Sequence, residues 1–191
     1  MMISIAETRR QRGFTLIEVL IALVIIAVGL LGVAGLQLSS LQNQLEAYQR
    51  AQAVMLAEEM AHRIRANAPA ARSVARPYVA GTQYGLLTPA SCDPNSITSA
   101  AYDLCDWNNS LAGQGVSLGG VNAGSVNAAR GCIEYLPSTA DGETRIRVTV
   151  AWQGTVATLD PNSSCGVGAF GDNDAFRRVA VTDVVLADLA N

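Results

Sequence analysis

A chain of 191 residues suits one domain with an appended segment. Half of the residues are apolar and only 15% are charged, and the positive mean hydropathy is unusual for a soluble domain and indicates a membrane segment. The net charge of −3 at pH 7 argues against a basic, nucleic-acid-binding protein.

The N-terminal region reads as a membrane anchor. Residues 1–13 are polar and contain three arginines, and residues 14–36 are apolar except for one Thr and one Glu. At about 1.5 Å per residue, this second stretch spans a bilayer core of about 30 Å with some tilt. The next arginine is Arg50, so the positive-inside rule predicts a cytoplasmic N-terminus and an exported C-terminal part.

Two simpler readings of this region compete. A cleaved secretory signal has an apolar core of about 7–15 residues that ends in a small-residue cleavage site. Here the run is longer, and its apolar periodicity continues past the small residues at 29–35. A plain anchor leaves Glu18 unexplained, because a carboxylate in a lipid-facing helix costs about 2.5–3.5 kcal/mol.

The start of the apolar stretch resembles the N-terminal motif of type IV pilins and pseudopilins. The matching residues are Arg12-Gly13-Phe14-Thr15-Leu16-Ile17-Glu18-Val19-Leu20. The resemblance implies that a prepilin peptidase cuts between Gly13 and Phe14 and methylates the new N-terminus, so that residues 1–13 are a cytoplasmic leader. It also implies that Glu18 neutralises the N-terminal amine of an adjacent subunit during assembly. The alternative is that Glu18 only satisfies the N-terminus of its own helix.

Apolar spacings of three and four continue beyond residue 36. They predict that residues 37–67 form an amphipathic extension of the membrane helix, from about residue 15 to residue 66, ended by Pro69. The predicted stripe is Leu38, Leu41, Leu45, Tyr48, Gln52, Met55, Glu59 and His62, widened by Leu56, Met60 and Ile64. Its polar members argue against the alternative of a coiled coil and favour packing on the chain's own sheet.

Residues 68–191 are predicted to form a small periplasmic head. A loop over 69–95 precedes a short helix over 96–112, capped by Gly113, and a flexible connection over 113–130. Strands are predicted over 131–136, 144–153 and 176–189, with a turn at Asp141-Gly142 and a bulge near Asp183. The predicted fold class is α+β: a long N-terminal helix packed on a small antiparallel sheet, as in pilins.

The four cysteines lie in the second half of the chain and predict disulfides. They are Cys92, Cys105, Cys132 and Cys165. No C-x-x-C pair and no nearby His supports zinc, whereas an even number on the exported side suits two bridges. We favour Cys92 with Cys105, which closes a short loop, and Cys132 with Cys165, which ties the first strand to the loop before the last. The sequence allows three pairings.

No catalytic or cofactor-binding constellation is recognisable in the sequence. His62 is the only histidine and has no acidic neighbour suited to catalysis. The segment around Asp172 offers carboxylates for calcium but lacks the other ligands of an EF-hand loop. We therefore predict no enzyme, no cofactor and no metal site.

Later segments resemble one family of minor pilins, the type IV pilus modification proteins. The matching segments are 27–37, 59–67, 107–108, 130–134 and 148–152. The resemblance implies a single-pass inner-membrane protein that primes pilus assembly, enters the tip complex, and supports adhesion and twitching motility. Implied partners are other minor pilins, the major pilin, the prepilin peptidase, the inner-membrane assembly platform and membrane lipid.

Two rival functions remain open. A minor pseudopilin of type II secretion would share the N-terminal motif. A tip adhesin or DNA receptor is the other, but removal of residues 1–13 leaves ten arginines and 15 acidic residues, a net charge of −5. The remaining basic pairs, Arg145 with Arg147 and Arg177 with Arg178, make a poor phosphate-binding surface, so nucleic acid is disfavoured.

Overall fold

A long helix, α1 (Leu16–Ala66), dominates the computed structural model. The structure describes residues 13–79, 83–86, 90–114, 117–118, 121–122, 126–138 and 142–187. By its contacts the chain divides into two compact units, one up to Asn43 and one from Gln44 onward, and α1 contributes to both. The helix bounds agree with the predicted span from about residue 15 to residue 66.

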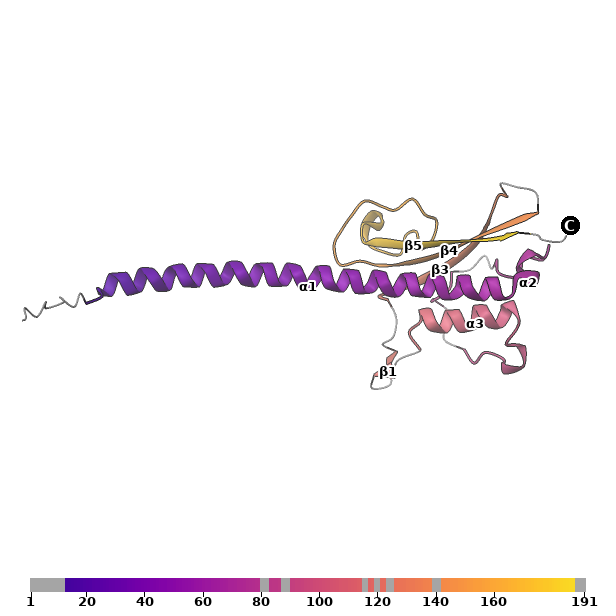
Figure 1. The fold of residues 1–191 in the computed structure, drawn as a ribbon, viewed down its shortest axis with the longest axis horizontal. Helices are drawn as coiled ribbons and strands as arrows, with labels where there is room; N and C mark the ends of the chain where they lie inside the picture. The colour runs from indigo at the N-terminus through magenta and orange to yellow at the C-terminus, as the bar shows by residue number, and fades with distance from the viewer. Residues whose placement is uncertain are drawn as a thin grey trace, which may run out of the picture. The chain divides into compact units, whose positions relative to one another are not determined.

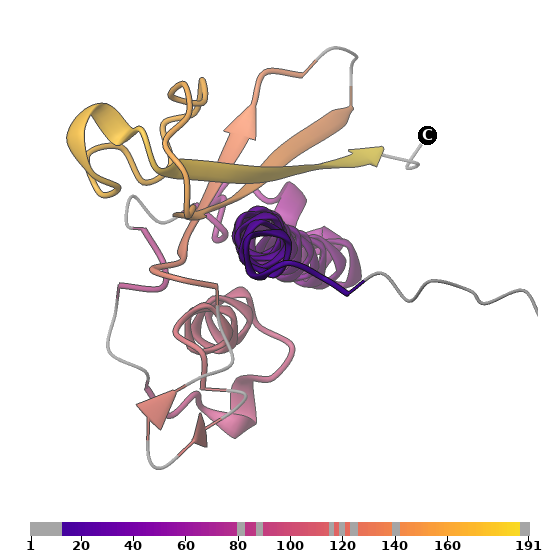
Figure 2. The same ribbon diagram turned by 90° about the vertical axis from the view of Figure 1, so that its left-hand side faces the viewer.

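The second unit combines the end of α1 with a three-stranded sheet. A short α2 (Ala68–Arg72) and α3 (Ala100–Leu111) follow α1 in the chain. The sheet has the order β3 (Arg130–Leu136), β4 (Glu143–Gln153) and β5 (Arg177–Ala187), and both pairings are antiparallel. Within this unit α1 lies between the sheet and α3 (Figures 1 and 2). The predicted α+β fold class is confirmed.

The head buries the three residues that widen the predicted stripe of α1, Leu56, Met60 and Ile64, but not the large apolar residues of the stripe itself. The buried residues are Ala53, Leu56, Ala57, Met60, Ala61 and Ile64. Leu45, Tyr48 and Met55, from the predicted stripe, are each more than half exposed. The small side chains of three buried alanines account for the rest of the difference, because they carry little weight in a pattern of large apolar residues.

The central strand β4 is buried on both faces at its C-terminal end. Ile146, Val148, Val150 and Trp152 form the predicted inward alternation and pack in the main core. On the opposite face, Ala151 is fully buried in a second small cluster with Cys165 and Phe170. The loop between β4 and β5 therefore covers part of the outer face of the sheet. Alternation of apolar residues along β4 does not predict this cover.

Three local predictions are wrong. Residues 69–95 contain α2 and a short 3₁₀ helix, Pro94–Ser96, rather than only loop. The connection after α3 contains a hairpin of β1 (Ser117–Leu118) and β2 (Val121–Asn122). No bulge occurs near Asp183, because β4 and β5 stay in one-to-one register throughout and Asp183 lies opposite Arg147.

Other boundaries differ by a few residues. Helix α3 begins at Ala100 rather than residue 96, because the Ser99 hydroxyl accepts a hydrogen bond from the Tyr102 N–H and caps the helix. Gly113 ends it with a φ of 81°, as predicted. Strand β5 begins one residue later than predicted, and its predicted end at 189 and Asp141 of the predicted turn lie outside the described residues.

Trp107 joins α3 to both α1 and β3. Its indole is fully buried, and Nε1 donates a 2.8 Å hydrogen bond to the Leu56 carbonyl of α1. Its ring lies against Gly131 of β3, where an added Cβ would overlap both Trp107 and the Leu111 side chain. The absence of a side chain at Gly131 therefore sets how closely α3 approaches the sheet.

We predict that Gly131→Ala lowers the free energy of unfolding by about 1–3 kcal/mol through overpacking. The same change should cost less than half as much when Trp107→Phe has already removed the outer indole ring. Thermal unfolding of the four proteins of this double-mutant cycle, followed by near-UV circular dichroism in detergent micelles, measures the coupling. Equal costs in both backgrounds would refute the close contact.

Candidate assembly site

The first unit presents an uncovered apolar helix. Fifteen large apolar side chains between Phe14 and Leu36 are each at least 50% exposed. Helix α1 is the one helix in the described part of the chain that is long and apolar enough to cross a membrane. Glu18 is the only charged residue of this stretch, so any environment that covers the helix must also accommodate one carboxylate.

Glu18 lies at the third helical position, directly after the start of α1. Its Oε2 is 3.5 Å from both the backbone N and the Oγ1 of Thr15, which donate long hydrogen bonds. A Thr before the helix and a Glu three residues later have the arrangement of a capping box. At this length the contact holds the carboxylate weakly. Glu18 therefore supports its own helix start and remains exposed to a second partner.

The predicted cleavage point immediately precedes this turn. Gly13, Phe14 and Thr15 have no regular secondary structure, and nothing lies within 4 Å of the position that a Gly13 side chain would occupy. Phe14 is 85% exposed. The peptide bond between Gly13 and Phe14 is thus open to an enzyme, while the remaining residues of the predicted leader, 1–12, lie outside the described residues.

In the second unit, Glu46 of α1 binds the loop that follows β4. Its Oε2 accepts hydrogen bonds from the backbone N (3.0 Å) and hydroxyl (2.7 Å) of Thr155, and its Oε1 accepts one from Arg178 (2.8 Å). Arg178 also donates to the Val156 carbonyl. Partial burial raises the pKa of Glu46, but the Thr155 hydrogen bonds and the attraction of Arg178 outweigh it, so the pKa lies below its ordinary value.

A buried arginine organises the loop that covers the outer face of the sheet. Arg177 is 2% exposed and donates to Asp160 and to the carbonyls of Ser163 and Cys165, at 2.5–3.2 Å. It also faces the Asp174 carboxylate at 3.6 Å. Because Cys165 is bonded to Cys132 of β3, the loop is held covalently at the point where the guanidinium binds it.

Asp174 belongs to the segment considered for calcium, and its carboxylate is engaged otherwise. It accepts hydrogen bonds from the backbone N–H groups of Gly168 (2.7 Å) and Phe170 (3.2 Å). The hydrogen bond from Gly168 is the largest influence on the pKa of Asp174. With the other N–H groups and Arg177 it outweighs desolvation, so the pKa of Asp174 lies below its ordinary value. No group of three His, Cys, Asp or Glu residues suited to a metal occurs among the described residues.

The arginine pairs considered for DNA are largely neutralised. Arg147 of β4 forms a bidentate ion pair with Asp183 of β5, and both hydrogen bonds are 2.8 Å long. Arg178 binds Glu46, and Arg177 is buried. Arg145 lies 3.3 Å from Glu143. The sequence places these arginines in pairs. Arg145 lies beside Glu143 of its own strand, whereas the partners of Arg147, Arg177 and Arg178 come from other segments or from across the sheet.

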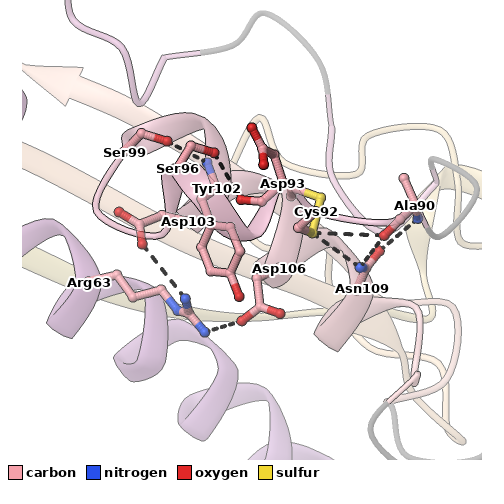
Figure 3. Close-up of a disulfide and its surroundings, with 11 residues drawn as sticks. Arg63, Ala90, Cys92, Asp93, Ser96, Ser99, Tyr102, Asp103, Asp106 and Asn109 are labelled. Atoms are coloured by element: carbon pink, nitrogen blue, oxygen red, sulfur yellow. Dashed lines mark hydrogen bonds and ion pairs between the residues drawn. A yellow bond between two sulfur atoms is a disulfide. The ribbon is translucent and has the colours of Figure 1, made fainter.

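The second disulfide, between Cys92 and Cys105, fastens the segment before α3 onto that helix (Figure 3). The structure thus has both pairings favoured from the sequence. The Asn109 amide reinforces the Cys92–Cys105 bridge, because it donates to the Ala90 carbonyl (2.8 Å) and to Cys92 Sγ (3.4 Å). This end of the head is therefore held by one disulfide and by the hydrogen bonds of the Asn109 side chain.

Below this disulfide, Arg63 joins α1 to α3. Figure 3 shows its guanidinium reaching toward Asp103 and Asp106 of α3, and it also binds Glu59 on its own helix at 2.8 Å. The Tyr78 hydroxyl donates to Asp103 at 2.5 Å, and burial together with this bond raises the pKa of Tyr78 well above its ordinary value. Sequence reasoning missed this cluster, because only tertiary contact brings α1 and α3 together.

Comparison with known proteins agrees with this geometry. The family described as the prokaryotic N-terminal methylation motif matches residues 8–34, and the family described as type IV pilin Tt1218 matches residues 35–105. The two matches adjoin and cover the membrane segment, the rest of α1 and the chain up to Cys105 of α3. No curated protein and no solved structure matches the chain.

The chain belongs to the type IV pilin superfamily. Pilins are structural subunits, and the uncovered apolar helix with its N-terminal methylation motif fits a membrane-anchored pilin that assembles with other pilins.

We predict that Glu46→Gln lowers the free energy of unfolding at pH 7 by about 1 kcal/mol, because the neutral amide loses the attraction of Arg178. The pKa of Glu46 is lowered in the folded state, so its contribution is complete above the unfolded pKa of about 4.3 and is lost as the pH falls through the folded value.

Thermal unfolding of wild type and Glu46→Gln at pH 7 and at about pH 3 measures this difference. Glu134→Gln on the exposed side of β3 is the matched control, and it should change little at either pH. A Glu46→Gln effect of equal size at both pH values would show that charge at this position does not contribute.

Proposed function

We propose that the chain is a minor pilin of the type IV pilus, of the type called PilV or type IV pilus modification protein. In this role it primes pilus assembly, enters the tip complex, and supports adhesion and twitching motility. The observation that carries the proposal is the apolar first unit with a single carboxylate at Glu18. Such a helix needs a bilayer around it before assembly and the helices of other subunits around it afterwards.

The magnitude of the exposed surface supports an obligate partner. Each large apolar side chain gains about 1.5–3 kcal/mol when it leaves water. Fifteen such side chains in the first unit are at least half exposed, far more than a soluble monomer leaves in one continuous patch. The same face can be covered by lipid and by other pilin helices in turn, because both are apolar.

The later segments of resemblance favour the minor-pilin assignment through the fold of the head. Trp107 and the stretch Val148–Trp152 are buried in the core. Residues at these positions specify how α3 and β4 pack rather than a binding surface. A minor pseudopilin of type II secretion would use the same N-terminal features, and the system in which the chain is assembled separates the two roles.

We expect the processed protein to begin at methylated Phe14. Intact-mass analysis of the membrane-extracted chain, from cells with and without prepilin peptidase, tests this directly. A mass matching methylated residues 14–191 only when the peptidase is present supports the proposal. An uncut chain in both strains, or a cut after the apolar stretch, would instead indicate an ordinary anchored or secreted domain.

The role of Glu18 can be separated from its capping role. Glu18→Gln keeps a side chain that can complete the capping box but removes the charge. If Glu18 pairs with the amine of a neighbouring subunit, we expect normal cleavage but at least a tenfold lower amount of the chain in sheared pili. That loss reflects an amine left without its partner in an apolar environment.

Thr15→Ala is the matched control, because it removes the hydroxyl that donates to Glu18 and leaves the carboxylate in place. We expect this variant to enter sheared pili at close to the wild-type level, measured by immunoblot against the membrane fraction. The opposite pattern, with Glu18→Gln tolerated and Thr15→Ala defective, would assign Glu18 to its own helix.

A further inference from the structure

A basic pocket lies where α2 meets the turn end of the sheet. It has a volume of about 450 Å³ and is lined by residues that follow α1, by the end of β3 and by the start of β4. Arg72, Arg76 and Arg145 line it together with Tyr135, Ser73 and one carboxylate, that of Glu143. Arg72 and Arg76 belong to the segment that follows α1, and Arg145 lies on β4; of the three, only Arg145 belonged to a predicted basic pair.

The structure holds Arg76 in a defined position. Its backbone has a φ of 46°, in the left-handed region that residues with a side chain seldom adopt. Its guanidinium lies 5.3 Å from the centroid of the Tyr135 ring, a cation–π contact. The Tyr135 hydroxyl in turn donates a 2.7 Å hydrogen bond to the Ala71 carbonyl, which fixes the ring. Backbone, ring and hydrogen bond together orient one cation toward the pocket.

The charge of this pocket is positive in a chain that is otherwise acidic. Arg145 is paired with Glu143 at 3.3 Å. Within the part of the chain that the structure describes, no carboxylate forms an ion pair with Arg72 or Arg76, and both residues are exposed. Two guanidinium groups without a carboxylate partner among the described residues thus line one pocket, although the mature chain would carry a net charge of −5.

We infer that this pocket binds an acidic peptide segment of a protein partner, with an Asp or Glu carboxylate between Arg72 and Arg76. Guanidinium groups bind carboxylates through two parallel hydrogen bonds, which suits an arginine held in place. Val74, 99% exposed, and Leu136 add apolar surface on which the residues next to the carboxylate can pack. The site is independent of the cleavage and assembly proposed for the N-terminal helix.

Other anionic ligands fit this pocket less well. Nucleic acid and acidic polysaccharides carry a continuous row of charges, which the net negative chain repels beyond the pocket. A sugar ring would also need an aromatic face to stack on, and the face of Tyr135 is covered by Arg76. One or two carboxylates flanked by apolar side chains match both the size and the lining of the pocket.

The test uses the uncleaved full chain in neutral detergent micelles and a fluorescein-labelled peptide, Gly-Leu-Glu-Glu-Leu-Gly-amide. Binding is measured by fluorescence anisotropy at low and at physiological salt. A peptide with Gln in place of Glu, a 20-base-pair DNA duplex and polygalacturonate are compared with it. We expect the Glu peptide to bind at least tenfold more tightly than the Gln peptide, and more weakly as salt rises.

Variants assign the binding to the pocket. Arg72→Gln and Arg76→Gln should each weaken Glu-peptide binding at least fivefold, whereas Arg50→Gln, an exposed arginine on α1 outside the pocket, should leave it unchanged. Arg72 has no ion-pair partner among the described residues, so its variant should keep the wild-type circular dichroism spectrum even if Arg76→Gln misfolds. Equal binding of the two peptides, an unchanged affinity in Arg72→Gln, or pocket-dependent binding of DNA or polygalacturonate in place of the peptide would overturn the inference.

Discussion

The burial of the alanine-bearing face of α1 in the core is the constraint on which the rest of the head depends. Ala53, Ala57 and Ala61 are fully buried and allow Leu56, Met60 and Ile64 between them to reach the core. The sheet and α3 cover two sides of this part of α1, and the rest of its surface stays exposed in this chain. A single helix therefore serves two purposes. Its C-terminal part is the central element of the head, and its N-terminal part is a surface for lipid or other subunits.

Polar contacts then fasten the head to that helix at both ends. Glu46 binds the loop after β4 near the start of the second unit, and Arg63 binds α3 near the end of α1. On the outer face of the sheet, Arg177 and a disulfide hold the covering loop. Exposed ion pairs contribute little alone, but these contacts are partly buried and join segments far apart in the chain, so they fix geometry more than they add stability.

Much of the fold could be predicted, and the errors lie where tertiary contacts that local patterns do not show decide the outcome. The length of α1 and the three strands follow from local patterns, whereas the cysteine pairing was one favoured choice among three that the structure then confirmed. The buried face of α1 was predicted only in part, through Leu56, Met60 and Ile64, because alanine is too small to dominate an apolar pattern. The expected bulge at Asp183 was also wrong: its polarity is matched by Arg147 across the strands, a partner that no local pattern shows.

The sequence by itself determined the class of the protein and the features of its N-terminus. The motif around Gly13 and Glu18 and the long apolar stretch are contiguous, so their chemistry can be read without folding the chain. Tertiary structure alone decided which arginines are neutralised, which face of α1 is buried, and that Arg72, Arg76 and Arg145 meet in one pocket. The physical reason is that charge pairing and packing depend on distances in space, and α2 is separated from β3 and β4 by dozens of residues in the chain.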